Sequence, residues 1–158
     1  MGLLREITFY HKFNKPLFSS LFAETLTSLT FGNDFNRRLS PKIFPESLRK
    51  LTFGRDFNYP IIVGVLPDNL IELNFVVNSH FNQPFNKGAL PSSLTNLTFG
   101  YIYNQYLDVS PLTNLAHLTI GISHSNQNID KSKLSSTLIS LNFHESVPNW
   151  IWWRLHNN

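Results

Sequence analysis

An eleven-residue stretch, Leu48 to Asn58, constrains the fold of this chain more than any other feature, because close copies of it recur along the sequence. It reads L-R-K-L-T-F-G-R-D-F-N. The copies follow one another at steps of 21 to 24 residues and begin at Leu4, Leu26, Leu48, Leu70, Leu94, Leu115 and Leu138. Such a chain folds as a row of similar coils, each of which buries its apolar side chains against its neighbours.

The apolar positions within each copy predict one short strand per coil. The fourth position is always Leu or Ile, and the sixth is Phe or Ile. Side chains alternate across an extended chain, so we expect these two positions to face inward and the third and fifth to face outward. A period of about 20 to 29 residues with this core is typical of leucine-rich-repeat solenoids. No helical apolar period is sustained, so we predict a β-rich solenoid of about seven coils with a parallel sheet and little helix.

A second recurring element, Phe-Asn, follows the predicted strands, and in three coils it reads Phe-Asn-x-Pro. The chain must turn a corner here, and a buried Asn amide can satisfy backbone groups of its own and adjacent turns. We therefore predict a structural role for the Asn of six coils, namely Asn14, Asn36, Asn58, Asn82, Asn104 and Asn126. A Ser, Thr or Asn precedes most strands and is expected to cap that turn.

The combined pattern L-P-x-S-L-x-x-L-x-F-G-x-x-F-N-x-P resembles the FNIP repeat, a relative of the leucine-rich repeat found in social amoebae and in large DNA viruses of amoebae. The resemblance covers residues 4–147. It implies a protein-binding solenoid, which often follows an F-box and reads the substrate of a ubiquitin ligase. Here the repeats begin at Leu4, so we expect no F-box ahead of them. An F-box-less recognition module, or a decoy acting on host ubiquitin ligases, is one alternative.

Length and composition fit a single domain of this kind. The 158 residues are 42% hydrophobic and 15% charged, so the chain can bury a core. We expect one solenoid over residues 1–158, with the Trp-rich stretch 148–158 as a C-terminal cap. The chain has no cysteine and no run of about 20 apolar residues, and we expect no secretory signal because Arg5 and Glu6 interrupt its first residues. We expect a cytoplasmic, intracellular protein, in the host cytoplasm if it is viral, with no membrane partner.

The cations are unevenly distributed, because residues 1–55 hold nine Lys and Arg against four Asp and Glu. The net charge of +3 is nevertheless too small to imply a polyanion partner. We interpret the basic residues of the second and third coils as a solvated surface rather than a nucleic-acid site, since no platform of exposed aromatics is expected among them. They are Arg37, Arg38, Lys42, Arg49, Lys50 and Arg55.

No pattern indicates catalysis, and we expect no enzyme, cofactor or metal. The six histidines occupy different repeat positions and form no ligand set. Asp34 and Asp56 follow successive strands and lie roughly one strand spacing apart, about 5 Å, where carboxylates can share a cation. Lys12 or Arg55 could equally neutralise them, so we interpret both as solvated turn residues.

The repeat lengthens in the fourth and sixth coils, and apolar residues occur beside these insertions. Insertions in solenoids often map to the binding face, and contiguous exposed apolar side chains mark interaction sites. The candidate protein-binding residues are Val77, Tyr101, Ile102 and Ile122. Two readings stay open: they contact another protein, or they fold back over the core. We predict a non-enzymatic protein-interaction scaffold; a self-associating structural protein, paired through the edge from Leu4 to Phe9, is the other alternative.

Overall fold

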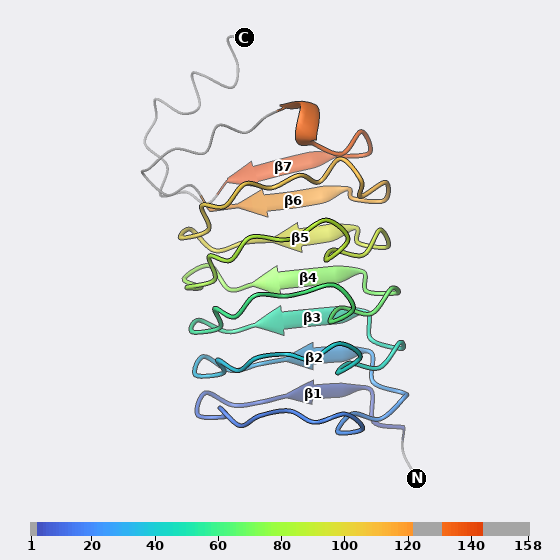
Figure 1. The fold of residues 1–158 in the computed structure, drawn as a ribbon, viewed down its shortest axis with the longest axis vertical. Coiled ribbons are helices and arrows are strands. Elements are labelled where there is room, and N and C mark those ends of the chain that lie inside the picture. Colours follow the sequence, from blue (N-terminus) through green and yellow to red (C-terminus); the bar gives the residue numbers. More distant parts are fainter. Residues whose placement is uncertain (1–2, 122–130, 144–158) are drawn as a thin grey trace.

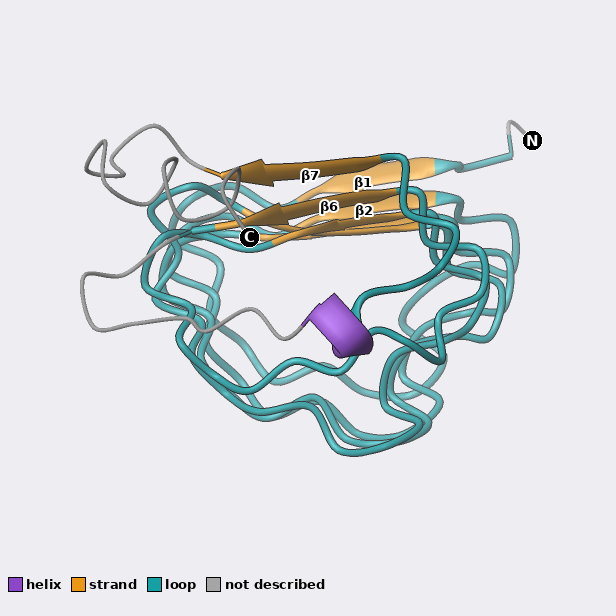
Figure 2. Ribbon diagram, turned by 90° about the horizontal axis from the view of Figure 1, so that it is seen from above, coloured by secondary structure: helices purple, strands orange, loops and turns teal. Residues whose placement is uncertain are grey.

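The structure, a computed structural model, describes residues 3–121 and 131–143, in which seven short strands form one parallel sheet. Each strand pairs with the next in chain order, so the coils stack in a row (Figure 1). Viewed along this row, each coil is a loop with the sheet as its flat side (Figure 2). The strands are β1 (Glu6–Thr8), β2 (Ser28–Thr30), β3 (Lys50–Phe53), β4 (Glu72–Phe75), β5 (Asn96–Thr98), β6 (His117–Ile120) and β7 (Ser140–Phe143).

The predicted β-rich solenoid with little helix is confirmed. The one helical element in the described ranges is the 3-10 turn η1 (Lys131–Lys133). Within residues 3–121 and 131–143, no helix has the length and apolar character needed to cross a bilayer. The stretch 148–158, expected to cap the last coil, lies outside the described residues.

The sheet register matches the repeat register, because equivalent residues of successive copies pair side by side. Leu51, for example, pairs with Leu29 on one side and Leu73 on the other. The fourth-position residues of the second to sixth coils have no exposed surface, whereas third-position residues face outward, where Lys50 and Glu72 form an ion pair of 3.0 Å. The predicted inward and outward faces are therefore confirmed.

Two parallel columns of aromatic rings fill the interior of the coils. Ring centroids are 5.5 Å apart along the first column, 5.9 to 6.0 Å apart along the second, and 3.9 to 4.1 Å apart between the two rings of one coil. Each stacked pair adds about 0.5 to 1.5 kcal/mol to the gain from burial. The columns are Phe9, Phe31, Phe53, Phe75 and Phe99, and Phe13, Phe35, Phe57, Phe81 and Tyr103.

The Asn column forms a ladder of hydrogen bonds between coils. The backbone N–H of each Asn donates to the side-chain oxygen of the Asn one coil earlier, at 2.8 to 3.1 Å from Asn14 through Asn104. In two coils the next residue adds a second donor, since Gln83 and Gln105 bond the same oxygens at 3.1 and 3.2 Å. These Asn side chains are half-buried. Asn126 lies outside the described residues.

A second ladder joins the coils where the chain enters each strand. The hydroxyl groups of Thr25, Ser47 and Ser93 donate to the carbonyl oxygens of Leu4, Leu26 and Leu70 at 2.8, 2.6 and 2.6 Å. Each bond spans one full turn of the solenoid, 21 to 23 residues, rather than closing a local turn. Polar groups at both ends of the sheet are thus satisfied by stacking, which a buried backbone requires.

Backbone packs directly on backbone at the end of the strands. A Cβ atom on Gly54 would lie 2.2 Å from the carbonyl oxygen of Gly32, and a Cβ on Gly32 would lie 2.4 Å from that of Tyr10. No side chain fits between these turns. The fourth coil carries Val76 at this position, and its turn is the one that the two extra residues enlarge.

Removing one Asn side chain from the ladder should destabilise the stack of coils. We expect Asn58→Ala to lower the free energy of unfolding by about 1 to 3 kcal/mol, because it leaves the N–H of Asn82 without its acceptor. Asn58→Asp keeps an acceptor oxygen and should cost much less. Urea denaturation of both variants checks this, and equal losses would contradict the ladder's role.

A methyl group at Gly54 should be far more damaging than one at an open turn. We expect Gly54→Ala to cost about 3 kcal/mol or more, since turn backbones must separate. Gly88 has φ +82° and nothing within 4 Å of an added Cβ, so Gly88→Ala should cost only about 1 kcal/mol for the strained backbone. Thermal and urea unfolding of the Gly54→Ala and Gly88→Ala variants measure the two losses of stability.

Candidate protein-binding surface

The turns that follow the strands stack at one end of the sheet, which we call the exit end (Figure 1, at the arrowheads). Backbone hydrogen bonds join each exit turn to the one before it: Asp34 N–H to the His11 oxygen at 2.9 Å, and Asp56 N–H to the Asn33 oxygen at 2.8 Å. The His80 N–H likewise bonds the Arg55 oxygen at 2.7 Å. Side chains on these turns are therefore presented from a rigid backbone.

The two extra residues of the fourth coil form an ordered bulge in its exit turn. Ser79 is fully buried and folds back, with its N–H bonded to the Val76 oxygen at 2.8 Å and its hydroxyl oxygen accepting from the Phe81 N–H at 3.2 Å. These bonds close the bulge and leave Val77 and Asn78 exposed at its tip. The insertion thus turns an apolar side chain outward.

Three of the four candidate residues lie together on this end, and we call Val77, Tyr101 and Ile102 the apolar ridge. Their exposed fractions are 47%, 36% and 41%. The Tyr101 N–H donates to the Val77 oxygen at 3.0 Å, so the fourth and fifth coils are in contact here. In the structure these three side chains are partly exposed; that they bind a partner stays a prediction. Ile122 lies outside the described residues.

The exit turn of the third coil carries a charged pair. Arg55 Nε lies 2.9 Å from Asp56 Oδ1, and His80 Nδ1 lies 3.4 Å from the same oxygen. The hydrogen bond from Arg55 lowers the pKa of the Asp56 carboxyl, and the same contact raises the pKa of Arg55. The Asp56 carboxylate is therefore neutralised by Arg55, in place of a cation shared with Asp34. No three His, Asp or Glu side chains among the described residues are placed to hold a metal ion.

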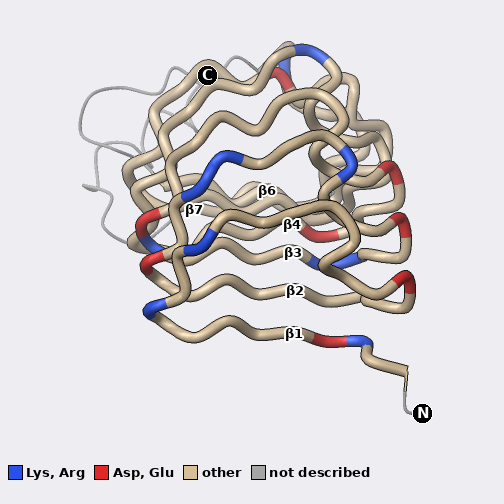
Figure 3. The backbone as a smooth tube through the Cα atoms, turned by 60° about the horizontal axis from the view of Figure 1, so that its bottom comes forward, with Lys and Arg blue, Asp and Glu red and all other residues tan. Residues whose placement is uncertain are grey.

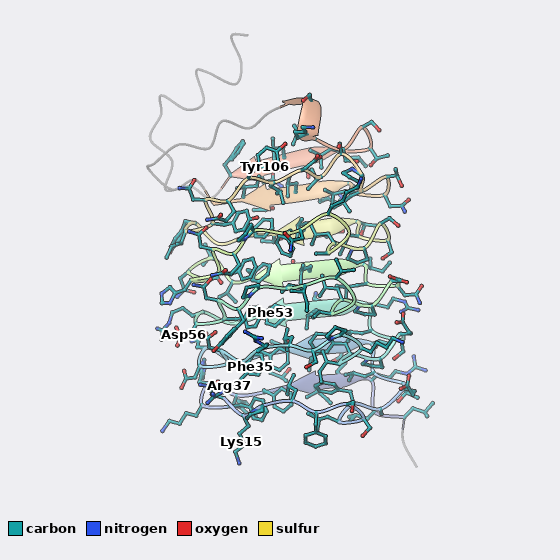
Figure 4. All side chains as sticks on the ribbon, in the orientation of Figure 1. Lys15, Phe35, Arg37, Phe53, Asp56 and Tyr106 are labelled. Carbon is teal, nitrogen blue, oxygen red and sulfur yellow. The ribbon has the colours of Figure 1, made fainter. Side chains whose placement is uncertain are left out.

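Four exposed cations of the first two coils lie in or shortly after the exit turns, and we call Lys12, Lys15, Arg37 and Arg38 the basic corner. Arg37 Nε donates to the Asn14 carbonyl oxygen at 3.0 Å, which holds its guanidinium over the first coil. None of the four forms an ion pair with a described carboxylate. Lys15 and Arg37 lie on the same side of the stack as Asp56 (Figure 4).

The structure disperses the six cations that the sequence groups in the second and third coils. Lys50 pairs with Glu72 on the outer sheet face, and Arg55 pairs with Asp56. Arg49 bonds the Glu46 oxygen before its strand, and Lys42 occupies a left-handed turn with φ 59°. Only Arg37 and Arg38 remain together.

The sequence analysis did not group Lys12 and Lys15 with Arg37 and Arg38, and it did not single out the exposed Tyr59 and Tyr106. Lys15, Arg37 and Tyr59 each follow the Asn of their coil, so they occupy one column. The sequence signal that could have identified this column is the variable position of Phe-Asn-x-Pro. It comes directly after the Asn of the ladder and carries the exposed side chains of Lys15, Arg37 and Tyr59.

A stack of similar coils with one parallel strand each, joined by side-chain ladders, defines a leucine-rich-repeat-like β-solenoid, a non-enzymatic type of scaffold that typically binds proteins. The FNIP Repeat family matches residues 13–56, 35–77 and 81–122. The chain therefore belongs to the FNIP repeat family.

A solved structure of a giant-virus protein has a similar fold. It is CroV588, described as a novel circular LRR protein structure, with a TM-score of 0.72 and 33% sequence identity. The similarity covers 88% of this chain but 23% of that one, so this chain spans about a quarter of the length of its neighbour. The search of curated proteins finds no match.

The Arg55–Asp56 pair should be visible in a titration. Because the folded pKa of Asp56 lies below its ordinary 3.8, the pair stabilises the fold above that pH and loses its effect as the pH falls through the folded pKa. We expect Arg55→Gln to move the Asp56 midpoint upward in a carbon-detected NMR titration. Lys50→Gln, on the outer sheet face, should leave it in place; an unchanged midpoint in Arg55→Gln would contradict the pairing.

Proposed function

We propose that this chain is a scaffold that binds another protein through the apolar ridge, and that it acts in the cytoplasm. The observation that carries the proposal is the exposure of Val77, Tyr101 and Ile102 on neighbouring turns, where the Tyr101 N–H bonds the Val77 oxygen and the repeat is interrupted. Exposed apolar side chains on neighbouring turns favour a partner, because water is released when they are covered.

The rigidity of the exit end supports this proposal. The ridge stands on turns whose backbones are bonded to neighbouring coils, so a partner does not have to order a loose loop on binding. The outer sheet face is a weaker candidate, since it presents Thr, Ser and Asn side chains and the Lys50–Glu72 pair. Aromatic anchors dominate interface energetics, and the ridge contains one in Tyr101.

A second candidate is self-association through the first coil. Among the described strands β1 pairs with β2 alone, and Leu4, Tyr10 and Phe18 beside it are exposed. An unpaired strand edge is a template for another chain. Sedimentation velocity over a wide concentration range tests this candidate, and a mass that does not change with concentration would eliminate it.

Substitutions in the ridge should abolish partner capture without unfolding the protein. We expect Val77→Asp with Tyr101→Ala to reduce captured protein roughly tenfold or more, because a central aromatic anchor is lost and a charge is introduced. Capture from an amoeba cell lysate with quantitative mass spectrometry measures this. The melting temperature should stay close to that of the unchanged chain, since all affected side chains are exposed.

The matched control is Ile139→Asp with Tyr106→Ala, which makes the same kinds of change at exposed residues outside the ridge. It should retain the captured proteins. If the captured proteins bind the ridge variant as well as the control variant, the ridge is not their binding site. Ubiquitin-ligase subunits among the ridge-dependent proteins would assign the recognition or decoy role to this chain.

A further inference from the structure

The exit end changes in chemical character along the stack. The first two coils carry the basic corner, the third carries the neutral Arg55–Asp56 pair, and the fourth and fifth carry the apolar ridge. This order follows the solenoid axis, because each coil adds one strand to the same sheet. A partner that lies along the exit end would therefore meet cations at one end and apolar side chains at the other.

The positive charge of the basic corner is only partly compensated by acidic residues of the same turns. Asp34 is the one carboxylate in the exit turns of the first two coils, against four cations. Glu24 and Glu46 stand just before the next strands, and Figure 3 shows acidic residues on successive turns at that opposite end of the sheet. This separation of charge attracts an acidic partner to the exit end of the first two coils.

The corner and the ridge are close enough for one short segment to contact both. Along the stack, the second and fifth coils are three strand spacings apart, roughly 14 Å at about 4.8 Å each. An extended chain advances about 3.3 Å per residue, so four to five residues cover this step, and a few more cover the offset between Arg37, which follows the Asn column, and the ridge on the exit turns. Tyr59, exposed in the same column as Arg37, lies one coil further toward the ridge and offers an aromatic contact on the way.

We infer that the exit end binds an extended protein segment with acidic residues at one end and apolar residues at the other, the acidic end on the basic corner and the apolar end on the ridge. This rests on the proposed function and adds the chemistry of the partner. Arg37 contributes a held guanidinium, because Nε is bonded to Asn14 and the terminal nitrogens remain to meet a carboxylate.

Panning a library of random 12-residue peptides on phage tests this without knowledge of the natural partner. The baits are the unchanged chain, a corner variant (Lys15→Glu, Arg37→Glu), a ridge variant (Val77→Asp, Tyr101→Ala) and a control (Lys42→Glu, Lys87→Glu). The control makes the same change in net charge on the return segments, away from the exit end. Circular dichroism and melting curves establish that each bait is folded.

The unchanged chain and the control should enrich peptides in which Asp or Glu residues stand several positions from Leu, Phe, Tyr or Trp. The corner variant should enrich apolar peptides without the acidic bias. A synthetic peptide of the enriched type should bind the corner variant about tenfold more weakly and should bind the unchanged chain less well at high salt.

Absence of acidic enrichment, or equal enrichment on the corner variant, would overturn the inference. If the inference fails but apolar peptides bind the unchanged chain and not the ridge variant, the proposed function still holds. If peptides bind the ridge variant as well as the unchanged chain, both the inference and the proposed function are wrong. Binding of a single-stranded oligonucleotide that the corner variant loses, with no acidic peptide enriched, would assign the corner to nucleic acid and also overturn the inference.

Discussion

The stacking of like side chains at the spacing of parallel strands is the constraint on which the rest of this structure depends. Strands repeat at about 4.8 Å, so any residue inside a coil lies against its equivalent in the next. The rings meet this demand by lying parallel, with Phe53 stacked on Phe31 and Phe75 at interplanar angles of 7° and 20°. An isolated coil would lose these contacts on both sides, which explains why the coils must occur in a row.

Polar groups meet the same demand through ladders. Asn side chains accept backbone N–H groups of the following coil, and Ser or Thr hydroxyls donate to carbonyl oxygens one full turn of the solenoid earlier. Strands of three or four residues leave most of each coil in turns, whose backbone polar groups must still find partners. Bonds between coils provide them, so the turns are as regular as the sheet.

Variation is greatest at positions whose side chains do not pack between coils. A side chain at Gly54 would strike the backbone below it, while the neighbouring Arg55, Val77 and Tyr101 point away and are free to differ in chemistry. The bulge held by Ser79 enlarges this freedom in the fourth coil. The exit end therefore combines a rigid backbone with a variable surface, which are the two properties that a selective binding site needs.

The period, the strands, the inward columns and the recurring Asn follow from the amino-acid sequence alone, because each is a repeated chemical pattern that only in-register stacking can satisfy. The sequence did not determine which way the fourth coil's insertion turns, since Val77 could have covered the core or faced water. Nor did it show that Lys50 and Arg55 are neutralised while Lys15 and Arg37 lie together. Those outcomes depend on distances between coils, which residues far apart in the chain acquire only when the solenoid is assembled.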